Sequence, residues 1–94
     1  MAFREYRVDL RRRVQRTLNS MPKRDRKSII EALQSLKRIA RPRGVEKVSG
    51  TNSQLWRIRP GDYRIVHHID DQERIVTVVR IGHTREIYRA IQQA

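Results

Sequence analysis

Residues 55–64 read Leu-Trp-Arg-Ile-Arg-Pro-Gly-Asp-Tyr-Arg, and they carry the clearest structural pattern in the chain. Apolar and basic residues alternate on both sides of a Pro-Gly pair, which predicts two strands joined by a tight turn, a β-hairpin. Pro60 suits the first central position of a type II turn, and Gly61 accepts the positive φ of the second. With Pro60 and Gly61 as the whole loop, Arg57 faces Arg64 across the hairpin.

This register sorts the side chains of the hairpin onto two faces. The apolar face carries four residues: Trp56, Ile58, Tyr63 and Ile65. Arg57 and Arg64 lie on the other face, where two cations directly opposite each other repel. An empty site gains little from this arrangement, whereas a site that binds a phosphate group gains a great deal.

A second hairpin is predicted within residues 63–81, around a polar turn. If Asp70 faces Arg74 in this hairpin, Arg64 faces Arg80. The two hairpins together predict one mixed face, with three arginines in a row and three valines: Arg57, Arg64, Arg80, Val66, Val76 and Val78. We expect helices from the N-terminal half of the chain to cover the opposite face.

The N-terminal half predicts one strand and two helices. Residues 3–8 alternate weakly like a strand, and Asp9 suits the N-cap of the helix that follows. Apolar residues then recur at helical spacing in two groups: Leu10, Val14, Leu18 and Met21, then Ile29, Ile30, Leu33, Leu36 and Ala40. Pro22 suits the first turn of the second helix, and Pro42 and Gly44 end it.

These elements predict an α+β fold, a four-stranded antiparallel sheet with an N-terminal two-helix hairpin on one face and a short C-terminal helix. The helices are joined too tightly to be anything but antiparallel, and the apolar face of the sheet is their obvious partner. Residues 82–91 supply the last helix, with Thr84 at its N-cap. With no internal repeat and no linker, residues 1–94 are expected to form a single domain.

Composition limits the classes of function. The net charge of +12 predicts a polyanionic or acidic partner, such as nucleic acid, an anionic membrane or an acidic protein. The chain has no cysteine, which excludes a disulfide framework, a zinc ribbon and a cysteine nucleophile. No apolar run approaches the roughly 20 residues of a membrane span, and no secretory signal is apparent. The cytoplasm is therefore the expected location.

The side chains that are able to take part in a reaction are arginines, one histidine and one tyrosine. His67 and His68 point to opposite faces of a strand, so they cannot share a ligand, and His67 is expected to be a core histidine with a hydrogen-bonded partner. The acidic turn at 70–73 is more typical of a charged hairpin tip than of a metal site. His83, Arg85 and Tyr88 follow the last strand and are expected near the arginine row. Such a set can cleave RNA without a metal, because arginines stabilise the charge that builds on phosphate oxygens when the 2′-hydroxyl attacks.

Two segments resemble the RelE/ParE superfamily of toxins from toxin–antitoxin pairs. They are residues 55–64, quoted above, and residues 80–89, Arg-Ile-Gly-His-Thr-Arg-Glu-Ile-Tyr-Arg. The resemblance covers nearly the whole chain and implies the order strand, two helices, three strands and a C-terminal helix. RelE-like members are mRNA endonucleases that act in the ribosomal A site, so the resemblance implies a metal-independent endoribonuclease that inhibits translation.

The resemblance also implies roles for individual residues. Six positions match the basic, histidine and tyrosine positions of such toxins and form the candidate catalytic set: Arg57, Arg59, Arg64, His83, Arg85 and Tyr88. With Arg80, the first three are also expected to bind RNA. Arginine is harder to deprotonate than the lysine found in many relatives, so Arg57 and Arg59 suit phosphate binding better than proton transfer. Acid–base duty is then expected of Tyr88 or His83, unless Tyr88 only packs under the sheet edge and His83 only caps a helix.

Two other functions fit the same residues. The ParE-like branch poisons DNA gyrase and needs no catalytic set, and a basic module that only binds nucleic acid or the ribosome needs none either. For the RelE-like function, the expected partners are the ribosome, mRNA and an acidic antitoxin, disordered until bound, which covers the arginine face or displaces the C-terminal helix. No metal, cofactor or membrane is expected.

Overall fold

The computed structural model describes residues 5–48 and 54–83 of the chain. In chain order its elements are β1 (Arg7–Leu10), α1 (Arg12–Ser20), α2 (Lys23–Leu36), β2 (Glu46–Lys47), β3 (Leu55–Ile58), β4 (Tyr63–Asp70) and β5 (Ile75–His83). The strands form one sheet in the order β1-β5-β4-β3-β2. The predicted C-terminal helix at 82–91 begins within β5 and otherwise lies outside the described residues.

The predicted sheet of four antiparallel strands is wrong in two details, because the described sheet has five strands and is mixed. β1 runs parallel to β5, and the short strand β2 pairs with β3 at the other edge. No tight turn connects β1 to its neighbour, so the alternation of its side chains carries no information about its direction. β2 spans only two residues, which is too short for a periodic pattern to predict.

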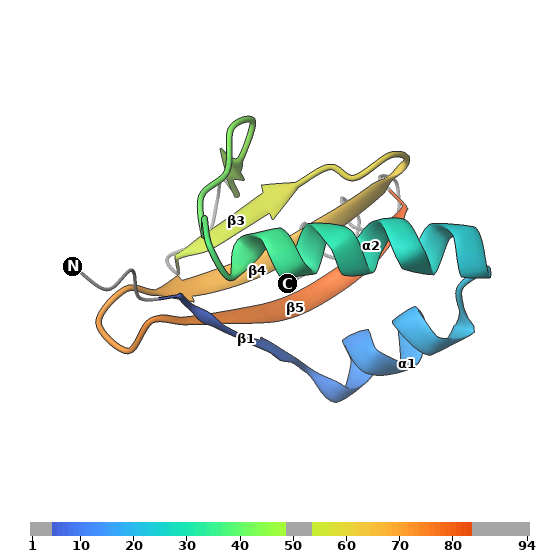
Figure 1. The fold of residues 1–94 in the computed structure, drawn as a ribbon, viewed down its shortest axis with the longest axis horizontal. Helices are drawn as coiled ribbons and strands as arrows, with labels where there is room; N and C mark the ends of the chain where they lie inside the picture. The colour runs from blue at the N-terminus through green and yellow to red at the C-terminus, as the bar shows by residue number, and fades with distance from the viewer. Residues whose placement is uncertain (1–4, 49–53, 84–94) are drawn as a thin grey trace.

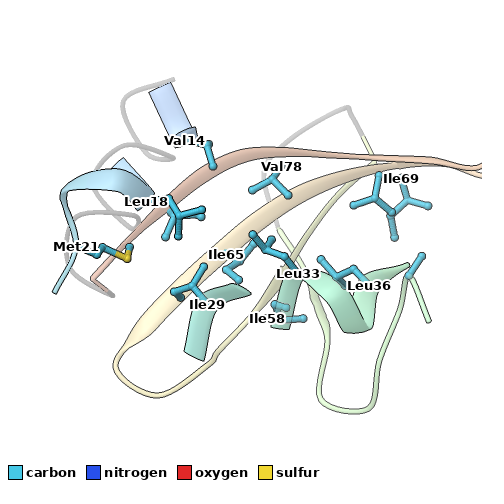
Figure 2. Close-up of a cluster of buried hydrophobic side chains, with 13 residues drawn as sticks. Val14, Leu18, Met21, Ile29, Leu33, Leu36, Ile58, Ile65, Ile69 and Val78 are labelled. Atoms are coloured by element: carbon cyan, nitrogen blue, oxygen red, sulfur yellow. The ribbon is translucent and has the colours of Figure 1, made fainter. Parts of the chain in front are cut away.

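Both predicted helices are present, and they pack on one face of the sheet (Figure 1). Their predicted ends are wrong: Asp9 and Leu10 belong to β1, Arg11 is the N-cap of α1, and α2 ends at Leu36, before Ala40. Their apolar stripes meet the apolar side chains of the strands in one core, whose labelled members are drawn in Figure 2. Val14 and Leu18 come from α1, and Ile29 and Leu36 come from α2. All four are buried, so most of the stability of these short helices comes from packing against the sheet.

The hairpin of β3 and β4 has a longer loop than predicted. Ile58 pairs with Ile65 and Arg57 pairs with Val66, so residues 59–64 lie between the last paired positions of the two strands. Gly61 has φ +62 and the Tyr63 N–H donates to the Pro60 carbonyl at 3.2 Å, so the turn is centred one residue later than predicted. A turn with glycine at its first central position matches the twist of the flanking strands. Because the register error is two residues, every side chain keeps its predicted face.

The predicted register of β4 and β5 is wrong by one residue near the turn that connects them. Asp70 pairs with Ile75 instead of Arg74, which has φ 55 in the turn. A shift of one residue exchanges the two faces of a strand, so Val76 and Val78 lie in the core and not beside the arginines. A bulge opposite Val66 and His67 then restores the predicted faces, and the residues from position 80 onward alternate as expected.

The turn between β4 and β5 is tied to the N-terminal half of the chain by Asp71. Its carboxylate accepts a hydrogen bond from the Tyr6 hydroxyl at 2.6 Å and two from Arg41 at 3.0 Å each. The bonds from Arg41 and then Tyr6 are the main causes that lower the pKa of Asp71 to about 2. The carboxylate therefore contributes to stability only while it is ionised.

The contribution of Asp71 should be visible as a dependence of stability on pH. The pKa of Asp71 is about 2 in the folded chain, compared with the ordinary value of 3.8 expected in the unfolded chain. Its contribution to stability is therefore present above pH 3.8 and is lost as the pH falls toward 2. Because the carboxylate is exposed, we expect at most about 1 kcal/mol. Urea unfolding between pH 2 and 6 measures it. The difference between wild type and Asp71→Asn should shrink toward zero in acid, and a constant difference would contradict this assignment.

Candidate nucleic-acid interface

Three arginines project from the face of the sheet that α1 and α2 do not cover, here called the arginine face. Arg57 on β3 and Arg80 on β5 both pair with Val66 on the strand between them. Arg57, Val66 and Arg80 therefore form a row across the sheet. Arg64 lies two residues from Val66 on β4 and pairs with Gly82. The predicted shared face of the three arginines is confirmed, but Arg64 and Arg57 are not directly opposite each other.

Arg57 and Arg64 gather with Arg59, which follows β3, into an arginine cluster. Partial burial lowers the pKa of Arg64, and the positive charges of Arg59 and Arg57 lower it further. The Arg64 Nη1 also donates to the Tyr63 carbonyl at 3.4 Å. Like charges held this close raise the electrostatic free energy of the folded chain, and a bound anion would lower it. The cluster therefore suits a phosphate group.

Glu46 is the acidic member of this site, and the sequence-based reading missed it. As the cross-strand partner of Arg57, its Oε2 lies 2.7 Å from the Arg57 Nη2. The hydrogen bond from Arg57 is the largest cause that lowers the pKa of Glu46, and the charges of Arg59 and Arg64 add to it. The Arg57 Nε is buried and has no hydrogen-bond partner in the described part of the chain. Only the pairing of β2 with β3 reveals this arrangement.

Removing the charge of Glu46 should strengthen anion binding at the arginine cluster. The carboxylate occupies one Nη of Arg57 and repels any second anion, so we expect Glu46→Gln to bind a non-cleavable oligonucleotide up to about 5-fold more tightly. Isothermal titration at low salt measures the change. Glu31→Gln is the matched control, because it alters the net charge equally from an exposed position on α2. Equal gains for the two variants would show that only net charge matters.

His83 lies at the end of β5, as predicted, but on the other side of the sheet from the arginine cluster and not beside the arginines. It pairs with Tyr63, and the two rings stack with centroids 4.6 Å apart and planes 27° apart. The Tyr63 hydroxyl donates to the Asp25 Oδ2, 2.9 Å away in the first turn of α2. Strand alternation explains the separation, since Ile81 and His83 face the helices while Gly82, between them, pairs with Arg64.

The other candidate residues are not part of the arginine cluster as described. Arg85 and Tyr88 lie outside the described residues. His67 is confirmed as a core histidine, fully buried with its Nε2 3.1 Å from the Ala40 carbonyl, and burial lowers its pKa. Within residues 5–48 and 54–83, no group of three or more histidine and acidic side chains is arranged to hold a metal ion.

A small apolar cluster accompanies the arginines. Val66 on β4 and Val48, just after β2, are buried, with Leu55 and Val79 partly buried against them. Val66 was predicted on this face, whereas Val76 and Val78 are replaced there by Val79, the residue that the bulge in β5 inserts. The arginine face therefore combines positive charge with a limited apolar area.

Comparison with known families identifies the class of protein. Residues 4–88 match the family model for the ParE toxin of the type II toxin–antitoxin system parDE. The chain belongs to this toxin family. The match includes residues 55–64 and all but the last residue of the 80–89 segment, and it extends over both helices and the entire described sheet.

Solved structures of RelE toxins share the fold. An archaeal RelE–RelB complex from Pyrococcus horikoshii matches with a TM-score of 0.75 and 28% identity over 84% of this chain and 94% of that chain. A RelBE toxin–antitoxin complex from Mycobacterium tuberculosis matches with a TM-score of 0.74 and 25% identity, over 84% and 98% of the two chains. The isolated E. coli RelE toxin, at 18% identity and a TM-score of 0.71 over 94% and 97%, shows the fold alone.

Two further comparisons add limits. Among proteins with curated functions, none matches the sequence. None of the helices in the described residues has the length and apolar character needed to cross a membrane.

Proposed function

We propose that this toxin is a ribosome-dependent mRNA endonuclease of the RelE type. The observation that carries the proposal is the arginine cluster, on the face of the sheet that α1 and α2 leave uncovered. Partial burial and the nearby charges of Arg59 and Arg57 lower the pKa of Arg64 there. Such a cluster suits the phosphate at which a strand is cut, because the negative charge on the phosphate oxygens grows in the transition state. The fold shared with RelE toxins supports the same function.

In the proposed reaction, the 2′-oxygen of the nucleotide before the cut attacks the adjacent phosphorus. A bond from the 2′-oxygen to phosphorus forms, the bond from phosphorus to the 5′-oxygen breaks, and the 2′-hydroxyl proton passes to a base while an acid protonates the 5′-oxygen. The arginine cluster binds the phosphate oxygens, and Arg85 is proposed to assist it. His83 and Tyr88 are the proposed proton-transfer groups, because guanidinium groups stay protonated. The ribosome contributes by holding the mRNA in place.

A second function, inhibition of DNA gyrase, is supported by the family model, which is named for ParE toxins. Gyrase poisoning needs a binding surface and no proton-transfer groups. The arginine face would then contact protein or DNA, and substitutions that remove only a hydroxyl or an imidazole would leave toxicity intact. This difference separates the two functions experimentally.

One experiment distinguishes these functions. Purified protein is added to ribosomes translating a defined mRNA, the mRNA ends are mapped, and supercoiling by purified gyrase is measured in parallel. Cuts within A-site codons together with normal supercoiling are expected. A supercoiling defect without cuts would establish the ParE-like function. If neither cuts nor a supercoiling defect is observed, the protein is a basic binding module without chemistry.

An acidic antitoxin is the proposed protein partner. The Pyrococcus horikoshii and Mycobacterium tuberculosis relatives were solved as toxin–antitoxin complexes, which supports a bound partner for this chain. Leu55 and Val79 offer apolar contacts beside the arginines, so an amphipathic acidic segment fits the arginine face. Association should slow as salt rises, because salt screens attraction to a chain of net charge +12. Coexpression with the neighbouring reading frame tests this, and a chain that is harmless alone and copurifies with no small acidic protein would refute it.

A further inference from the structure

We propose that Tyr63 is the positioning residue for His83, an inference that rests on the proposed proton-transfer role of His83. The two residues are cross-strand partners at the end of the β4–β5 ladder, and their rings stack with centroids 4.6 Å apart. The Tyr63 hydroxyl is in turn bound to Asp25 at 2.9 Å. Asp25, Tyr63 and His83 thus connect the first turn of α2 to the last residue of β5.

Tyr63 can hold the imidazole because both its backbone and its hydroxyl are held by hydrogen bonds. Its backbone N–H donates to the Pro60 carbonyl at 3.2 Å, and its hydroxyl donates to Asp25. The ring also packs against the main core. His83, by contrast, is exposed at a strand end, where a side chain is free to change rotamer unless a neighbour restricts it. The stacked phenol supplies this restriction, since offset stacking of aromatic rings is favourable.

The pair occupies the position next to Arg64 in the β4–β5 ladder, but on the helix side of the sheet. Arg64–Gly82 and Tyr63–His83 are adjacent pairs of the ladder, and their side chains leave the sheet toward opposite faces. An RNA strand that passes over this end of the sheet therefore meets phosphate-binding groups on one side and an oriented imidazole on the other.

Kinetics with three variants test the positioning role. Tyr63→Leu removes the stacked ring and should lower kcat for mRNA cleavage by up to about 10²-fold, because misplacing a catalytic group by about 1 Å has effects of this size. Tyr63→Phe keeps the ring but frees it from Asp25, so a smaller loss of kcat is expected. KM should stay unchanged in both, since the arginine cluster is intact. Tyr6→Phe is the matched control, because it also deletes a tyrosine–aspartate hydrogen bond, at the other end of the sheet.

Nuclear magnetic resonance measures the stacking of the two rings directly, through the chemical shifts of the His83 ring protons. In the wild type, the ring current of Tyr63 should shift the His83 ring-proton signals, which His83→Gln identifies by their loss. The shift should disappear in Tyr63→Leu, persist partly in Tyr63→Phe and remain unchanged in Tyr6→Phe. Unchanged His83 signals in folded Tyr63→Leu would overturn the proposal, as would an equal loss of kcat in Tyr63→Phe and Tyr6→Phe.

The two measurements keep this inference separate from the proposed function. If the His83 signals respond to Tyr63 but no variant and no wild-type protein cleaves mRNA, the endonuclease function fails while the geometric relation holds. If the wild type cleaves mRNA and Tyr63→Leu cleaves it equally well, the positioning role fails while the endonuclease function stands.

Discussion

Replacing Arg64 with alanine is expected to lower mRNA cleavage by about 10²- to 10³-fold, the usual cost of removing one donor that stabilises a developing oxyanion. Its guanidinium lies in the arginine cluster, and its pKa is lowered by partial burial and by the charges of Arg59 and Arg57. Removing it relieves that repulsion, so the free energy of unfolding should change little or rise. Single-turnover cleavage on programmed ribosomes measures the first effect, and urea unfolding measures the second.

The control for Arg64→Ala is Arg16→Ala, which removes one positive charge from an exposed position on α1. Arg16→Ala should cleave mRNA nearly as well as the wild type if the effect of Arg64 is local. A loss of several kcal/mol in the unfolding free energy of Arg64→Ala would instead identify the cluster as a structural element, as expected when a buried paired charge loses its partner.

Replacing Ile65 with alanine is expected to lower the free energy of unfolding by about 2–5 kcal/mol. Ile65 is the residue after Arg64 on β4, but its side chain points to the helices and is 0% exposed. It belongs to the core that also contains Ile29 and Leu33 of α2 (Figure 2), so truncation leaves a cavity that the packed helix cannot easily fill. Urea unfolding monitored by circular dichroism measures the loss.

Val79→Ala is the matched control for Ile65→Ala, because Val79 is only partly buried and belongs to the small apolar cluster on the arginine face. Its loss should be clearly smaller. Equal destabilisation by the two substitutions would contradict the assignment of the main core to the helix side of the sheet. Together, Arg64→Ala and Ile65→Ala separate activity from stability at neighbouring positions.

The alternation of residue types was enough to predict which residues share a face near the first hairpin. Trp56, Ile58, Tyr63 and Ile65 face the core as predicted, although the turn is centred one residue later than predicted. The prediction survived because an error of two residues preserves the face of every side chain. The same reasoning failed for Val76 and Val78, where the error was one residue.

The candidate site was only partly predictable for a similar reason. Three arginines on one face follow from local alternation, but the Glu46–Arg57 ion pair depends on two segments that meet only in the folded sheet. The bulge that returns Arg80 to the arginine face has no recognisable signal in the sequence. Likewise, nothing near His83 in the chain indicates that its ring stacks on Tyr63.

Local patterns were enough to predict the class of fold, the two helices, the buried histidine and the face that the arginines share. Each of these depends on periodicity or composition within a short segment. The folded chain was needed to establish the direction of β1, the pairing of β2, and the placement of His83 on the side of the sheet opposite Arg64. These features depend on contacts between residues far apart in the chain and on the loop lengths that set the strand registers. Local patterns of side chains do not encode either of them.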